Sequence, residues 1–170
     1  MQLGVKMLQS KIVVEPEKCT GCRICELQCS VTHEKVFNPK KARIRLIRLE
    51  PAIDMPILCL QCQKPPCADI CPVGAININE NGVVIIDEKE CIGCGLCVEA
   101  CPFGAIFVNP EKNTPIKCDL CGGDPQCVKH CPTGALKFTT LNLSPKNRRE
   151  KFAKERVKPI LKRWGIHEKT

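Results

Sequence analysis

Hydrophobic positions along this chain come in short runs between turn residues and not in long periodic stretches. Ile76–Ile78, Val83–Asp87 and Leu136–Phe138 are each three to five residues long and rich in β-branched or large apolar side chains, so each predicts a short strand. Asn79–Gly82 separates the first two of these runs and is a turn signal. The pattern therefore predicts a β-hairpin in the middle of the chain.

The first third of the chain is patterned differently. Val31–Val36 is expected to extend a helix, and Asn38-Pro39 then predicts a turn. Ala42–Leu46 alternates like a half-buried strand. Residues 51–58 are bounded by proline and are expected to be a link to the next element.

A short motif repeats about every 30 residues, in which Cys-Pro is followed by any residue, then Gly-Ala and an aliphatic residue. Such a period indicates one supersecondary unit used several times. Strand, cysteine loop, short helix and strand are expected to alternate, which makes the fold class α+β. The motif occupies Cys71–Ile76, Cys101–Ile106 and Cys131–Leu136.

Composition changes the picture, because 16 of the 170 residues are cysteine and only six are aromatic, with no tyrosine. Stacked rings cannot fill the interior, so disulfides or metal sites are expected to replace them. Residues 1–11 contain no continuous apolar run and no twin-arginine signal. No segment has the roughly 20 apolar residues of a membrane span. A cytoplasmic location is therefore expected, where dense cysteine usually means metal.

The cysteines fall into four runs of four, in which the last gap is always three residues and a proline follows the last three runs. Two runs read C-x2-C-x2-C-x3-C, and the others widen the middle gap. This spacing is that of bacterial ferredoxins, in which the fourth cysteine of a run ligates the other cluster of a pair. The runs are Cys19, Cys22, Cys25 and Cys29; Cys59, Cys62, Cys67 and Cys71; Cys91, Cys94, Cys97 and Cys101; and Cys118, Cys121, Cys127 and Cys131.

Sixteen thiolates make four [4Fe–4S] clusters with no cysteine left over. A structural zinc protein is the alternative, but four-cysteine zinc sites usually use two separated C-x2-C pairs.

The basic C-terminal segment, residues 141–170, has ten Lys or Arg and three Glu. Ser144-Pro145 predicts a helix start there, with an apolar stripe at Ala153, Val157, Ile160 and Trp164. This segment is expected to dock on a partner subunit or to pack on its own domain, with a membrane surface or nucleic acid as the alternatives. In the zinc interpretation it would bind nucleic acid.

The four runs resemble the four-cluster iron–sulfur subunits of the dimethyl-sulfoxide-reductase and formate-dehydrogenase type. The segments Cys59–Cys67 and Lys117–Cys121 are part of this resemblance. Cys19–Arg45 looks more narrowly like the small subunits that accompany tungsten-containing aldehyde oxidoreductases. That stretch is also similar to electron-transfer proteins of hydrogenases and carbon monoxide dehydrogenases. The resemblance spans about residues 10–140.

The resemblance implies that outer runs pair with each other and that inner runs do the same. Two ferredoxin-like modules follow, one from residues 10–50 with 110–140 and one from residues 51–109, with residues 141–170 as a basic helical extension. Four cubane clusters are expected because Cys94, which some relatives replace, is present. The implied ligands are Cys19, Cys22, Cys25 and Cys131 for cluster A; Cys118, Cys121, Cys127 and Cys29 for cluster B; Cys59, Cys62, Cys67 and Cys101 for cluster C; and Cys91, Cys94, Cys97 and Cys71 for cluster D.

No catalytic constellation stands out, so the chain is expected to be a non-catalytic electron-transfer subunit that relays single electrons. The resemblance implies a tungsten or molybdenum pterin subunit as catalytic partner and ferredoxin or another redox subunit as the second partner. A subunit of a hydrogenase, formate dehydrogenase or carbon monoxide dehydrogenase is the alternative. No membrane span and no nucleic-acid partner are expected. His33 and His130 are expected to lie at the surface or around the ligands of a cluster without a special role, with tuning of a cluster by hydrogen bonding as the alternative.

Overall fold

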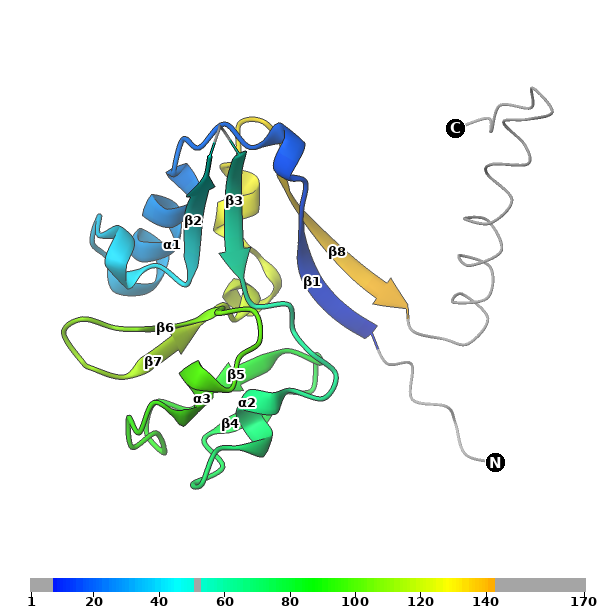
Figure 1. Cartoon of the computed structure of the whole chain (residues 1–170). Coiled ribbons are helices and arrows are strands. Elements are labelled where there is room, and N and C mark those ends of the chain that lie inside the picture. The colour runs from blue at the N-terminus through cyan, green and yellow to red at the C-terminus, as the bar shows by residue number, and fades with distance from the viewer. Residues whose placement is uncertain (1–7, 51–52, 143–170) are drawn as a thin grey trace, which may run out of the picture.

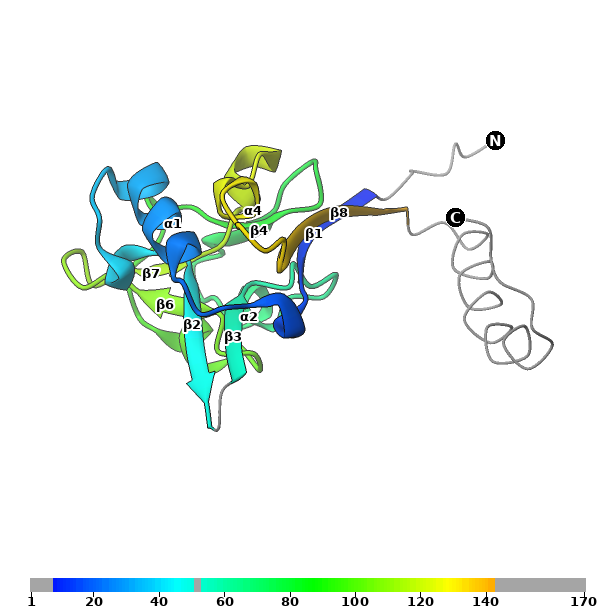
Figure 2. The same ribbon diagram turned by 90° about the horizontal axis from the view of Figure 1, so that it is seen from above.

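The computed structural model of the chain describes residues 8–50 and 53–142. Within these residues the strands form four antiparallel two-stranded sheets, accompanied by short helices (Figures 1 and 2). The α+β fold with short hairpins and short helices is therefore confirmed. Three sheets are hairpins, which pair β2 (Ile44–Leu49) with β3 (Ile53–Leu58), β4 (Ile76–Ile78) with β5 (Val84–Ile86), and β6 (Ile106–Val108) with β7 (Pro115–Lys117). The fourth sheet pairs the first and last described strands, β1 (Leu8–Val14) and β8 (Leu136–Asn142).

The helices belong to the cysteine runs. Four-residue helices hold the third cysteine of runs two, three and four, and the fourth cysteine follows just after each helix end. A turn follows the fourth cysteine in each of these runs, closed by a hydrogen bond from the Gly74, Gly104 or Gly134 amide to the carbonyl of that cysteine. Helices this short do not form alone, so packing holds them. The α-helices are α1 (Ile24–Glu34), α2 (Pro66–Asp69), α3 (Leu96–Glu99) and α4 (Gln126–Lys129), and the 3-10 turns are η1 (Pro16–Lys18), η2 (Pro39–Lys41) and η3 (Leu120–Gly123).

Run one differs because its helix α1 is 11 residues long and contains Cys29, so the expected extension is confirmed as far as Glu34. Ser30 stands where the other runs have proline, and it lets the helix continue. The Ser30 hydroxyl donates to the carbonyl of Leu27 at 2.9 Å and accepts from the amide of Asn38 at 3.3 Å. The helix ends at Lys35, whose φ of 58° is left-handed.

The expected link at residues 51–58 is wrong, because residues 53–58 form strand β3. Leu58 lies opposite Ile44, and Pro56 lies opposite Leu46. Asp54, Pro56 and Leu58 alternate inward, which is the period of a half-buried strand. Pro56 is tolerated because a two-stranded hairpin leaves the outer edge of each strand without a partner strand.

The core divides into two clusters of side chains, both of which include cysteine. One joins Ile12, Ile44 and Leu120 to cysteines of runs one, two and four. The other joins Ile76, Val84 and Ile106 to cysteines of runs two and three. No aromatic side chain is buried among the described residues. Aliphatic and cysteine side chains therefore fill the interior, as the composition predicts.

The hairpins lie in two parts (Figure 1). Strands β2 and β3 pack near α1 and α4 in the upper half, whereas β4, β5, α2 and α3 lie together in the lower half. The division of the chain at the predicted module boundaries stays a prediction. The helical stripe predicted for residues 153–164 lies outside the described residues.

Candidate metal centres

Each cysteine run begins with the same backbone bend. The residue two positions after the first cysteine has a left-handed φ in all four runs. That conformation curls the loop so that successive backbone N–H groups turn toward its inside, where they can meet an anion. These residues are Gly21 (φ 67°), Gln61 (52°), Gly93 (70°) and Leu120 (60°).

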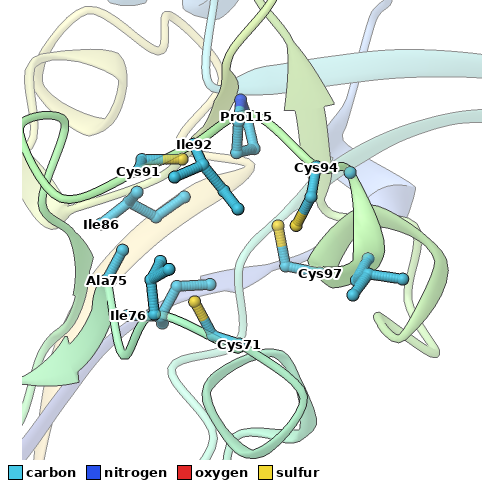
Figure 3. A pocket seen from close by; sticks show the side chains of 12 residues that line it. Cys71, Ala75, Ile76, Ile86, Cys91, Ile92, Cys94, Cys97 and Pro115 are labelled. Atoms are coloured by element: carbon cyan, nitrogen blue, oxygen red, sulfur yellow. The ribbon is translucent and has the colours of Figure 1, made fainter.

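Three hollows are each lined by four cysteines from two different runs. In one of them, the sulfurs of Cys71, Cys91, Cys94 and Cys97 face a common space between Ile76, Ile86 and Ile92 (Figure 3). In each hollow, three cysteines come from one run and the fourth comes from another. The other two hollows hold Cys59, Cys62, Cys67 and Cys101, and Cys19, Cys22, Cys25 and Cys131.

The remaining four cysteines also lie close together. Burial raises the pKa of Cys127, and the neighbouring thiols of Cys118, Cys29 and Cys121 raise it further. Cys29, Cys118 and Cys127 share one core cluster. Three of the cysteine sets that the resemblance implies therefore each line one hollow, and the cysteines of the remaining set are neighbours. Their assignment as cluster ligands stays a prediction.

The donor set fits an iron–sulfur cluster. Four sulfurs per group match its ligand demand. Burial raises the pKa of Cys25 and Cys118 to about 12, so bound metal must displace protons from these thiols. Backbone N–H groups already reach sulfur, since Arg43 N donates to Cys29 Sγ at 3.2 Å and Gln61 N donates to Cys59 Sγ at 3.4 Å. Such bonds stabilise the negative charge that thiolates bring to a cluster.

A buried polar junction joins run two to run four. The Gln61 side chain is fully buried, and its Nε2 donates to the carbonyl of Cys118 at 2.8 Å. Its Oε1 accepts from the amide of Val84 at 2.9 Å. Lys117, which is 3% exposed, donates from Nζ to the carbonyls of Val84 and Cys118. The polar side chains of Gln61 and Lys117 therefore tie the β4–β5 hairpin to the loop of run four.

His33 lies beside a cysteine, which sequence reasoning did not favour. Its Nε2 is 3.6 Å from Cys121 Sγ and 3.5 Å from Asp119 Oδ1, and its side chain is 12% exposed. Asp119 also accepts from Arg43 Nη1 at 2.6 Å. The sequence signal was weak: His33 lies one helical turn after Cys29, which the resemblance places in the same set as Cys121. His130, in contrast, is exposed, as expected, and its Nδ1 lies 2.9 Å from the carbonyl of Gln126.

No helix in the described part of the chain has the length and apolar character needed to cross a membrane.

The two exposed cysteines, Cys22 and Cys94, belong to different hollows. Every other cysteine is buried or half-buried.

Known proteins resemble this chain in sequence and in structure. The polyferredoxin-like subunit of aliphatic sulfonate oxidoreductase from Pyrococcus furiosus is 44% identical over 87 residues, which is 51% of this chain and 50% of that protein. Electron transport protein HydN of Escherichia coli is 35% identical over 96 residues, 51% of this chain and 52% of that protein. The chain thus spans about half the length of these curated relatives.

One similar solved structure is a chain of the active site complex BamBC of benzoyl coenzyme A reductase, in complex with benzoyl-CoA. It is 30% identical to this chain with a TM-score of 0.50, and the match covers 88% of this chain and 90% of that one. Residues 16–32 match a 4Fe-4S binding domain. Residues 52–141, more than half of the chain, match the 4Fe-4S dicluster domain. This protein therefore belongs to the 4Fe-4S dicluster domain family.

Proposed function

We propose that the chain is a non-catalytic electron-transfer subunit that binds four [4Fe–4S] clusters, with the ligand sets A to D given above. The observation that carries the proposal is the gathering of 16 cysteines into four groups, each made of three cysteines from one run and one from another. Zinc sites built from separated C-x2-C pairs would not need this exchange between runs.

The groups follow one another in the order A, B, C, D. Cys25 of group A is a neighbour of Cys127 of group B, whose pKa it raises. Cys59 of group C is a neighbour of Cys118 of group B, whose pKa it raises in the same way. Groups C and D meet in the second core cluster. Since exposed cysteines occur in A and D, these two groups form the ends of the proposed relay.

The residues around the cysteines partly cover the sulfurs and stabilise negative charge. When bound, a [4Fe–4S] cluster supplies one-electron chemistry. The apolar side chains of Ile76 and Ile86 cover one side of group D, whereas Cys94 of the same group is exposed. The N–H donors to Cys29 and Cys59 stabilise the charge of thiolates in the interior.

We propose further that one end of the relay meets a catalytic tungsten or molybdenum pterin subunit of the aldehyde oxidoreductase type. The other end would then serve ferredoxin or another redox subunit. This partner rests on the resemblance of Cys19–Arg45. The relative from Pyrococcus furiosus supports the wider role, since it is itself the polyferredoxin-like subunit of an oxidoreductase.

Iron and sulfide analysis of anaerobically purified protein tests the cluster count. We expect about 16 Fe per chain and four centres in a potentiometric titration. A sharper variant is Cys94→Ser, which should lose about one iron and give a three-iron signal in the oxidised protein by electron paramagnetic resonance. A colourless protein that contains zinc would contradict the proposal.

Affinity purification of the full chain from its native cells tests the partner. Tungsten or molybdenum with a pterin in the co-purified fraction would support the catalytic subunit proposed here. A nickel protein without pterin would overturn the choice of partner and leave the relay itself in place.

A further inference from the structure

Lys117 is the last residue of β7 and comes directly before Cys118. It is only 3% exposed. Its Nζ donates to two backbone carbonyls, those of Val84 and Cys118, and the second contact is 2.9 Å long. Carbonyls satisfy hydrogen bonds but do not neutralise an ammonium, and burying an unpaired charge is costly.

Among the residues that the structure describes, no carboxylate lies within ion-pair distance of Lys117. Asp119 and Glu88 line the same cavity, but both pair with Arg43, at 2.6 Å and 3.8 Å. Lys41 is the other buried lysine, and it has an ordinary partner in Glu111 at 2.7 Å. The missing counter-charge of Lys117 is thus particular to its position.

Lys117 lies next to cysteines of groups B and C. It directly precedes Cys118 of group B, and Val84, whose carbonyl accepts from Lys117 Nζ, lines the hollow that holds group C. Burial raises the pKa of Cys118, Cys62 and Cys67, and the nearby ammonium of Lys117 opposes that rise in all three. A [4Fe–4S] cluster with four thiolates carries a net charge of about −2 in its oxidised form. Reduction adds one more negative charge, so a nearby buried cation favours the reduced form.

We propose that the buried ammonium of Lys117 is the shared counter-charge of the two inner clusters, B and C, and that it raises the reduction potential of both. This inference rests on the proposed function. It makes Lys117 a positioning and tuning residue, since it contacts backbone carbonyls and does not ligate iron. Its position at the junction of Gln61, Val84 and Cys118 places the charge between the two groups.

The test is a potentiometric titration of the full-length protein with its clusters, monitored by electron paramagnetic resonance. Lys117→Met removes the charge at similar side-chain length. A unit charge roughly 10 Å away at an effective dielectric constant of about 20 changes the equilibrium constant for reduction about tenfold. We therefore expect the reduction potentials of two of the four centres to fall by about 59 mV, the one-electron equivalent of a tenfold change. The other two centres should keep their potentials.

Lys64→Met is the matched control. Lys64 lies between Cys62 and Cys67 of group C but is exposed, so water and salt screen its charge. We expect all four potentials to be unchanged in this variant. Lys117→Arg, which keeps the charge, should restore the two inner potentials toward those of the unmodified protein.

If K117M does not assemble, Lys117→Gln offers a neutral donor for the same carbonyls and is titrated in its place. Loss of two clusters in both neutral variants but not in K117R would also support a counter-charge. Loss of clusters in K117R as well would reduce Lys117 to a packing role and overturn the inference. Four unchanged potentials, or four equal shifts, in a neutral variant would also overturn it. An unmodified protein without four reducible centres would instead contradict the proposed function.

Discussion

Replacing Gln61 by leucine tests the junction between run two and run four. Leucine has a similar volume and the same backbone demand at a φ of 52°, so the variant removes mainly the two hydrogen bonds. The carbonyl of Cys118 keeps Lys117 Nζ as a donor at 2.9 Å. The amide of Val84 loses Gln61 Oε1 as its acceptor, and Val84 is only 1% exposed, so water cannot replace that acceptor.

The magnitude follows from these two losses. A buried N–H left without a partner costs about 1–3 kcal/mol, and the lost bond to a carbonyl that keeps another donor costs about 1 kcal/mol. Better burial of leucine offsets part of this sum. We therefore expect the free energy of opening at this junction to fall by about 2–3 kcal/mol.

Native-state hydrogen exchange suits this measurement, because cluster loss makes global unfolding irreversible. A fall of 2–3 kcal/mol corresponds to roughly 30- to 150-fold faster exchange of the Val84 amide. Mass spectrometry of a peptide that spans β5 in the anaerobic protein would measure this rate. Gln63→Leu is the matched control, because Gln63 is exposed in the same loop and should leave the rate unchanged.

Equal exchange of the Val84 amide in Q61L, Q63L and the unmodified protein would refute the reasoning. It would mean that Gln61 does not limit opening of the junction. Faster exchange in Q63L as well would show that the loop responds to any added apolar side chain.

Two further substitutions probe group A. Gly21→Ala should lower iron content, because the new Cβ would lie 2.4 Å from Oδ2 of the buried Asp54 and would force that carboxylate and its ion pair with Arg48 to move. Gly74→Ala has a similar positive φ but open space, so its iron content should stay normal. Glu26→Ala should lower the temperature of thermal inactivation relative to Glu26→Gln, since only the glutamine keeps an acceptor for the amide of Leu46. Leaving that buried amide without an acceptor costs about 1–3 kcal/mol. Equal inactivation temperatures would refute this role of Glu26.

Local sequence was sufficient for the repeated unit of this protein. The strand at Ile76–Ile78 was predictable, because short apolar runs on either side of a turn form a hairpin without distant help. The strand at Leu136–Phe138 was also predictable, but its partner β1 lies at the other end of the described chain and could not be read from neighbouring residues. The Asn79–Gly82 turn also forms as predicted, with the Gly82 amide donating to the Asn79 carbonyl at 2.9 Å. Cysteine spacing within a run indicated iron–sulfur chemistry from local sequence alone, since one loop supplies three ligands.

Strand β3 could not be recognised in this way. Its proline, Pro56, hid the inward alternation of Asp54, Pro56 and Leu58, and pairing with β2 gives that alternation a buried side. A strand that contains proline is stable only where tertiary structure leaves its edge open, and that is not readable from neighbours in the chain.

The surroundings of the inner cysteine groups were decided by tertiary structure alone. His33 and Cys121 are 88 residues apart, and Gln61 reaches Cys118 across 57 residues. Lys117 is next to a cysteine in sequence, yet its buried position depends on the β4–β5 hairpin that covers it. Sequence determined which residues can bind metal, because ligand spacing is local. The fold determined which charges and donors face them, because burial and low dielectric arise only when distant segments pack together.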